Sequence, residues 1–213
     1  MKIEVVSDVI CPWCFIGKRN LDVALAELAR EGLVFELGFR PFQLNPDMPR
    51  GGVPRAEYRL AKFGSAEKSA ELDARVTSAG KAAGIDFHFD RITRTPNTLA
   101  AHRLIRLAAD VGAQPAVKEA LMRAYFLEGR DIEAPDVLAD IAAAHGVDVA
   151  LLAGDTGFAE VIEQDNAARQ AGISGVPSFL MQNYFLFSGA MPPDALVENF
   201  RKVHGILQAR GEG

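Results

Sequence analysis

Cys11-Pro12-Trp13-Cys14 follows a short run that favours a β-strand, with Ile3, Val5 and Val6, and a turn-like Ser7-Asp8. Pro12 suits the first turn of a helix, because its φ angle is already helical and its missing N–H would have no partner there. The next segment, Lys18 to Arg30, spaces its leucines on one helical face. A second strand, Val34 to Phe39, is expected to follow. Strand, helix and strand within 40 residues indicate the start of a βαβ unit.

The two cysteines of the motif, Cys11 and Cys14, are the only cysteines among the 213 residues. Two cysteines placed at random in a chain of this length would have this spacing in about one case in a hundred. At the start of a helix, free N–H groups and the positive end of the helix dipole favour a thiolate at the first cysteine. We therefore predict that Cys11 is the nucleophile and that Cys14, one turn further on, is the resolving thiol.

Structural roles for the cysteine pair are less favoured. A zinc site would need two further ligands, and the four histidines, His88, His102, His145 and His204, show no ligand spacing to one another. His102 is expected on a solvated helix face and His145 at a helix C-terminus. We therefore expect no metal, although inert core thiols also remain open.

The middle of the chain is expected to be helical. Six prolines and glycines between Arg40 and Pro54 predict a long loop. Thr95-Pro96 reads as a helix cap followed by a proline at the first helical position, and Asp155 as a later cap. The amphipathic pattern after Thr95 places His102, Arg103, Arg106 and Asp110 on its solvated side. Further helices are expected near residues 55–63, 66–83, 115–128, 135–145 and 156–171.

The helical pattern stops at Gly172 to Pro177. Two strands follow, Ser178 to Met181 and Phe185 to Phe187, with a turn at Gln182-Asn183, and a last helix starts at Pro192-Pro193. The simplest architecture is one α/β domain, residues 1–50 and 172–213, interrupted by a helical domain, residues 51–171.

Composition excludes several classes of function. The chain is 49% hydrophobic, which supports a sizeable core, and its formal charge is −5 without a basic block. Nucleic acid is therefore an unfavoured partner. No apolar run reaches the roughly 20 residues that span a bilayer, and the N-terminus does not resemble a secretory signal. We expect no membrane association and a cytoplasmic location.

Four segments in order resemble the FrnE-like branch of the DsbA family of thioredoxin-like proteins. They are Asp8 to Lys18, Phe42 to Pro46, Thr95 to Leu104, and Gly175 to Phe179. The resemblance covers nearly the whole chain and is more specific than the cysteine motif alone. It implies an α/β, thioredoxin-like fold with an inserted all-helical domain.

The resemblance also implies a function and a site. The activity is expected to be thiol–disulfide exchange between the Cys11 and Cys14 pair and a protein or small-molecule thiol or disulfide. A cis peptide between Val176 and Pro177 is expected beside Cys11, so that Pro12, Trp13, Val176 and Pro177 contact the substrate. No bound cofactor is expected, and glutathione is the candidate thiol co-substrate.

Two departures from the family keep other functions open. The periplasmic members carry a signal peptide and usually a histidine between the cysteines, and both are missing here. A related branch, with 2-hydroxychromene-2-carboxylate isomerase and kappa-class glutathione transferases, generally has serine at the position of Cys11. A glutathione-dependent isomerase or transferase is therefore the second hypothesis, and a redox-inert binding protein or holdase is the third.

Overall fold

A computed structural model describes residues 1–212. Gly213 lies outside the described residues; it is the last residue of the segment 172–213 predicted for the α/β domain. Its main sheet has the strand order β2-β1-β5-β6. The strands are β1 (Lys2–Ser7), β2 (Glu36–Pro41), β5 (Ser178–Met181) and β6 (Tyr184–Ser188). β1 is parallel to β2 and antiparallel to β5, which in turn is antiparallel to β6.

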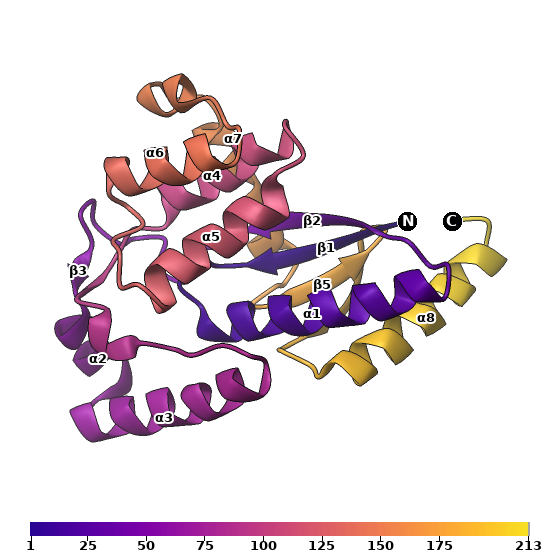
Figure 1. Cartoon of the computed structure of the whole chain (residues 1–213), viewed down its shortest axis with the longest axis horizontal. Helices are drawn as coiled ribbons and strands as arrows, with labels where there is room; N and C mark the ends of the chain where they lie inside the picture. The colour runs from indigo at the N-terminus through magenta and orange to yellow at the C-terminus, as the bar shows by residue number, and fades with distance from the viewer. Residues whose placement is uncertain (213) are drawn as a thin grey trace.

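Alternation along β1 supplies both faces of the sheet with apolar side chains. Ile3 and Val5 belong to the main core, whereas Val6 packs in a smaller cluster with Leu180 and Phe42. The helices α1 (Pro12–Arg30) and α8 (Pro193–Ala209) lie together against one face of the sheet (Figure 1). Because the sheet holds β1 in its interior, the loop after β1 and the start of α1 are fixed in position.

The chain between β2 and β5 is mainly helical, as expected. Figure 1 shows α4 to α7 grouped on the side of the sheet opposite α1 and α8, and α2 and α3 beyond the N-terminal end of α1. The helices are α2 (Arg55–Phe63), α3 (Ala66–Ala82), α4 (Leu99–Ala109), α5 (Gln114–Phe126), α6 (Pro135–Ala144) and α7 (Phe158–Gln170), with short 3₁₀ turns η1 (Phe89–Arg91) and η2 (Val149–Ala153). The domain boundaries at residues 50 and 172 stay a prediction.

Two predicted helix caps are wrong. Thr95 lies in a two-residue strand, β4 (Arg94–Thr95), which pairs with β3 (Val53–Pro54), and α4 begins only after Thr98. Pairing with β3 holds Thr95 in an extended conformation, and this excludes the helix from starting there. Asp155 is not the cap of α7, because Gly157, with a left-handed φ of 89°, occupies that position.

The predicted hairpin is confirmed. β5 and β6 are joined by Gln182 and Asn183, whose φ angles are 49° and 66°. Two positive φ values match the twist of tight hairpins, and asparagine tolerates them. β2 begins two residues later than predicted and ends at Pro41, because its register with β1 pairs Lys2 with Glu36 and Ser7 with Pro41.

The solvated face predicted for α4 is wrong at two positions. His102 and Arg103 are each only 3% exposed. The Arg103 guanidinium donates to the carbonyl oxygens of Thr156 at 2.6 Å and Leu152 at 3.1 Å, and it stacks over the Phe158 ring. α4 packs between β2, α5, α6 and α7, so tertiary contacts bury the side that sequence periodicity assigns to solvent.

Candidate active site

Cys11 lies at the N-terminal boundary of α1. Its backbone is extended, with φ −89° and ψ 113°, and its carbonyl oxygen accepts the N–H of Cys14 at 3.0 Å. Pro12 occupies the first turn, as the sequence predicted. The structure therefore places the Cys11 sulfur at the end of a helix whose first N–H groups have no helical acceptor.

Cys14 lies one turn further into the protein and is only 2% exposed, against 5% for Cys11. Burial raises the pKa of the Cys14 thiol well above its usual range, and the hydrogen bond and charge of Cys11 raise it further. The charge of Lys118 and a backbone hydrogen bond from Asp8 act in the opposite direction. Both cysteines are free thiols in this structure.

Val176 and Pro177 lie next to Cys11, although 165 residues separate them in sequence. The Cys11 thiol donates to the Val176 carbonyl oxygen at 3.7 Å, and the Val176–Pro177 peptide bond is cis. Close packing with α1 helps to hold this loop: a Cβ added to Gly17 would lie 3.0 Å from the Pro177 ring. The loop that carries Pro177, just before β5, thus contacts α1 at Gly17.

A cavity of about 270 Å³, called here the cysteine cavity, lies beside Cys11. Pro12 and Trp13 line it with Cys11, whereas Val176, whose carbonyl oxygen contacts the Cys11 sulfur, and Pro177 are not among its lining residues. Trp13 is half-buried and has the Arg75 guanidinium over its ring at 6.0 Å, while Phe15 is fully buried. The other apolar and aromatic wall residues are Ile10, Leu44, Tyr58, Phe63, Leu72, Val76, Phe89, Ile92, Tyr125 and Phe126.

A group of buried ionisable side chains lies behind the cysteines. The Asp8 carboxylate is fully buried; it accepts the N–H groups of Val9 at 2.7 Å and Leu44 at 2.8 Å and lies 3.1 Å from His102 Nε2. Lys118, on α5, is 1% exposed. Burial lowers the pKa of Lys118 to about 8, although the charges of Cys14 and Asp8 act to raise it.

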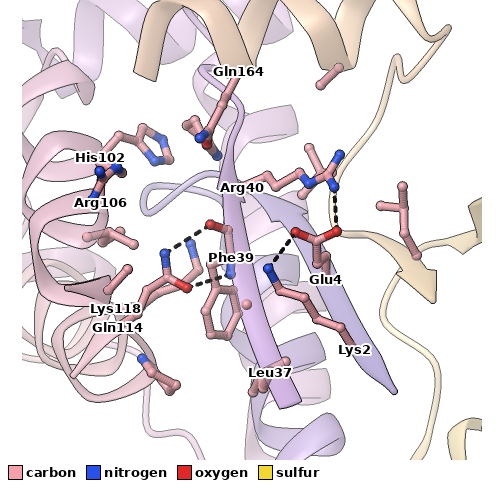
Figure 2. A pocket seen from close by; sticks show the side chains of 18 of the residues that line it. Lys2, Glu4, Leu37, Phe39, Arg40, His102, Arg106, Gln114, Lys118 and Gln164 are labelled. Atoms are coloured by element: carbon pink, nitrogen blue, oxygen red, sulfur yellow. Dashed lines mark hydrogen bonds and ion pairs between the residues drawn. The ribbon is translucent and has the colours of Figure 1, made fainter. Parts of the chain in front are cut away.

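A second cavity, of about 740 Å³, reaches the other side of this buried group. Figure 2 shows Lys118 and Gln114 extending from α5 toward Phe39 on β2, and His102 on α4 also lines the cavity. The Gln114 amide pairs with both backbone groups of Phe39, at 2.8 and 3.2 Å, so it satisfies part of the free edge of β2. Through His102 and Lys118, the second cavity borders the buried group that contains Asp8.

Sequence reasoning missed Asp8, His102 and Lys118 as neighbours of the cysteines. Asp8 reads as a turn residue in the sequence, and a lone lysine inside a helix gives no signal of burial. The cluster could have been suspected only from Asp8, because an acidic residue between a buried strand and a Cys-x-x-Cys helix is close to the thiols in space. Asn97, by contrast, lies at the start of α4, where its side-chain oxygen accepts the N–H of Leu99 at 2.9 Å.

A sheet with β1 in its interior, a helix that starts at a Cys-x-x-Cys pair, and a cis-proline loop against the first sulfur define a thioredoxin-like dithiol protein. The chain belongs to the family described as the DSBA-like thioredoxin domain, whose model matches residues 2–201. The structure is similar to that of the probable DsbA oxidoreductase SCO1869 from Streptomyces coelicolor, with a TM-score of 0.81, 30% identity, and coverage of 100% of this chain and 91% of that chain.

Two further solved structures share the fold at lower identity. Cytosolic disulfide reductase DsbM from Pseudomonas aeruginosa with GSH has a TM-score of 0.67 and 17% identity, covering 95% of this chain and 98% of that chain. A 2-hydroxychromene-2-carboxylate isomerase has a TM-score of 0.69 and 16% identity, covering 99% and 98%. Within residues 1–212, no helix combines the length and the apolar character needed to cross a membrane.

Proposed function

We propose that this protein is a thiol–disulfide oxidoreductase in which Cys11 attacks and Cys14 resolves. The observation that carries the proposal is the position of the two thiols: Cys11 lines a cavity at the start of α1, and Cys14 is buried one turn behind it. Only the Cys11 sulfur is accessible to a substrate, and the Cys14 sulfur can then attack the Cys11 sulfur from within the protein. Membership of the DSBA-like family and the similarity to a probable DsbA oxidoreductase support this proposal.

The surroundings of Cys14 explain the order of the two steps. Its raised pKa keeps it protonated while Cys11 carries negative charge, so Cys11 reacts first. Once Cys11 has formed a mixed disulfide, that charge is gone and its effect on Cys14 disappears. The Lys118 charge then favours the Cys14 thiolate, which attacks the Cys11 sulfur and releases the substrate thiolate.

The Val176 carbonyl supports binding of the substrate beside the sulfur. In this structure it accepts the Cys11 thiol proton. When Cys11 loses its proton, the carbonyl oxygen becomes free to accept an N–H from an extended substrate, as in strand addition. Glutathione, the candidate co-substrate, has such groups in its own backbone.

Serine substitutions test the proposal. Cys11→Ser should abolish reduction of a disulfide substrate, and Cys14→Ser should keep the first attack but accumulate the mixed disulfide, seen by mass spectrometry of the intact protein. Full activity of Cys11→Ser would exclude the mechanism. Saturable glutathione binding together with turnover that survives Cys14→Ser would instead favour the glutathione-dependent isomerase or transferase, which needs no ring closure.

A further inference from the structure

The cysteine cavity limits the size of a substrate that can contact Cys11. The cysteine is only 5% exposed, and the cavity that it lines has a volume of about 270 Å³, formed largely between α1, α2, α3 and α5. This volume is near the lower end for small-molecule sites. A compact molecule or one extended side chain fits such a space, whereas the surface of a folded protein does not.

The walls of the cavity are suited to a planar, apolar group. Trp13 lies beside Cys11, and Phe63, Phe89, Tyr125 and Phe126 supply further aromatic surface. Phe89 and Phe126 pack edge to face at 6.1 Å, and Tyr125 and Phe126 at 4.9 Å, so these rings are fixed by one another. Rigid aromatic walls favour an aromatic ligand, which stacks without ordering flexible side chains.

The charged residues of the cavity determine which sign of charge a ligand should carry. It is lined by Arg55, Arg59 and Lys62 but by a single carboxylate, Asp73, although the whole chain carries a net charge of −5. Asp73 binds both arginines at 2.8 Å. Within the described part of the chain, Lys62 forms no ion pair and its ammonium group bonds to the Tyr58 hydroxyl at 2.5 Å. The cavity therefore has an excess of positive charge.

We propose that the substrate attacked by Cys11 is a small aromatic disulfide that carries a carboxylate or similar anionic group. This inference rests on the proposed thiol–disulfide function and names its substrate class. The aromatic ring would lie between Trp13 and the phenylalanines, and the anionic group would face Arg59 and Lys62.

The reaction balances without a further reagent. The Cys11 thiolate forms a bond to one substrate sulfur, the substrate S–S bond breaks, and the first aromatic thiolate leaves with the electron pair. Cys14, after losing its proton to solvent, attacks the Cys11 sulfur, and the second aromatic thiolate leaves. The substrate gains two electrons as two thiolates, and the protein loses two as the Cys11–Cys14 disulfide.

Single-turnover kinetics with two aromatic probes test the substrate class. Reduced protein is mixed with 5,5′-dithiobis(2-nitrobenzoate), which is anionic, or with 4,4′-dithiodipyridine, which is neutral, and each rate is divided by the rate with 2-mercaptoethanol. The normalised rate should be higher for the anionic probe and should fall toward that of the neutral probe as salt is raised. Lys62→Gln should lower the ratio of the two normalised rates about three- to tenfold.

Lys68→Gln is the matched control, because Lys68 is an exposed cation of α3 that does not line the cavity, and its ratio should equal that of the wild type. Arg59→Gln, checked for folding by circular dichroism, should act in the same direction as Lys62→Gln. A ratio near one in the wild type, or equal ratios in all variants, would overturn the substrate class while leaving thiol exchange intact. If neither probe yields the Cys11–Cys14 disulfide, the proposed function fails and the inference fails with it.

Discussion

Lys118 combines a cost in stability with the role that we propose for it beside Cys14. Its amino group is buried on α5 near Cys14 and Asp8, and desolvation lowers its pKa from 10.5 to about 8. Below pH 8 the folded protein must bury this positive charge, which the unfolded chain leaves in water. Between pH 8 and 10.5 only the unfolded chain holds the proton, so the contribution of Lys118 to stability improves as pH rises.

Replacing Lys118 by methionine should therefore stabilise the reduced protein at pH 7, by about 1–3 kcal/mol. Asp8 keeps its two backbone N–H donors and His102 in the variant. Urea unfolding of both proteins at pH 7 and pH 10 measures the difference, which should shrink at the higher pH. A variant that is less stable at pH 7, or a gain that does not depend on pH, would contradict this account of the buried amine.

At the scale of the helix, two glycines within helices have opposite surroundings. A Cβ added to Gly80 on α3 would lie 2.5 Å from the Phe87 Cδ2 atom, whereas nothing lies within 4 Å of the same position at Gly205 on α8. Phe87 cannot easily move, since it packs against Phe15 at 6.0 Å and Phe126 at 5.2 Å. Gly80 therefore permits the close approach of α3 that closes one side of the cysteine cavity.

Gly80→Ala should destabilise the protein by about 1–3 kcal/mol through overpacking, despite the better helix propensity of alanine. Gly205→Ala, the matched control, should stabilise it by up to about 1 kcal/mol, because only propensity changes there. Thermal unfolding of the two variants compares them directly. Equal shifts of the two midpoints would show that the contact between α3 and Phe87 is looser than the structure indicates.

Across the whole molecule, burial is distributed unevenly. α2 buries none of its residues and α3 buries only Ser69, Val76 and Gly80. α4 and α5 each bury seven residues and pack on each other and on β2. Segments with few buried apolar contacts open locally at low free energy cost. α2 and α3, which form part of the wall of the cysteine cavity, are thus less firmly held than α4 and α5.

Hydrogen exchange measured by mass spectrometry should show this difference. Amides of α2 are expected to exchange at least about tenfold faster than amides of α4 and α5. The local opening of α2 that such exchange reports would also give substrates a route to Cys11. Uniform protection from α2 to α5 would mean that the region unfolds as one unit and that access depends on the static opening alone.

Local patterns in the sequence predicted most of the fold. The alternation before Ser7, the helix start at Pro12 and the hairpin at Gln182-Asn183 could be predicted because each depends on neighbouring residues. The predicted start and the predicted solvated face of α4 were wrong because contacts with segments distant in sequence determine both. Thr95 pairs with Val53, which delays α4, and the packing of α4 buries His102 against Asp8.

The sequence by itself determined the paired thiols at a helix start and the family to which the chain belongs, because spacing and helix-end chemistry are local. Only the tertiary structure decided what surrounds those thiols: Lys118 behind Cys14, the Val176 carbonyl at Cys11, and the cationic aromatic cavity beside it. These features arise from segments up to 165 residues apart, brought together by burial of apolar surface that no local pattern records.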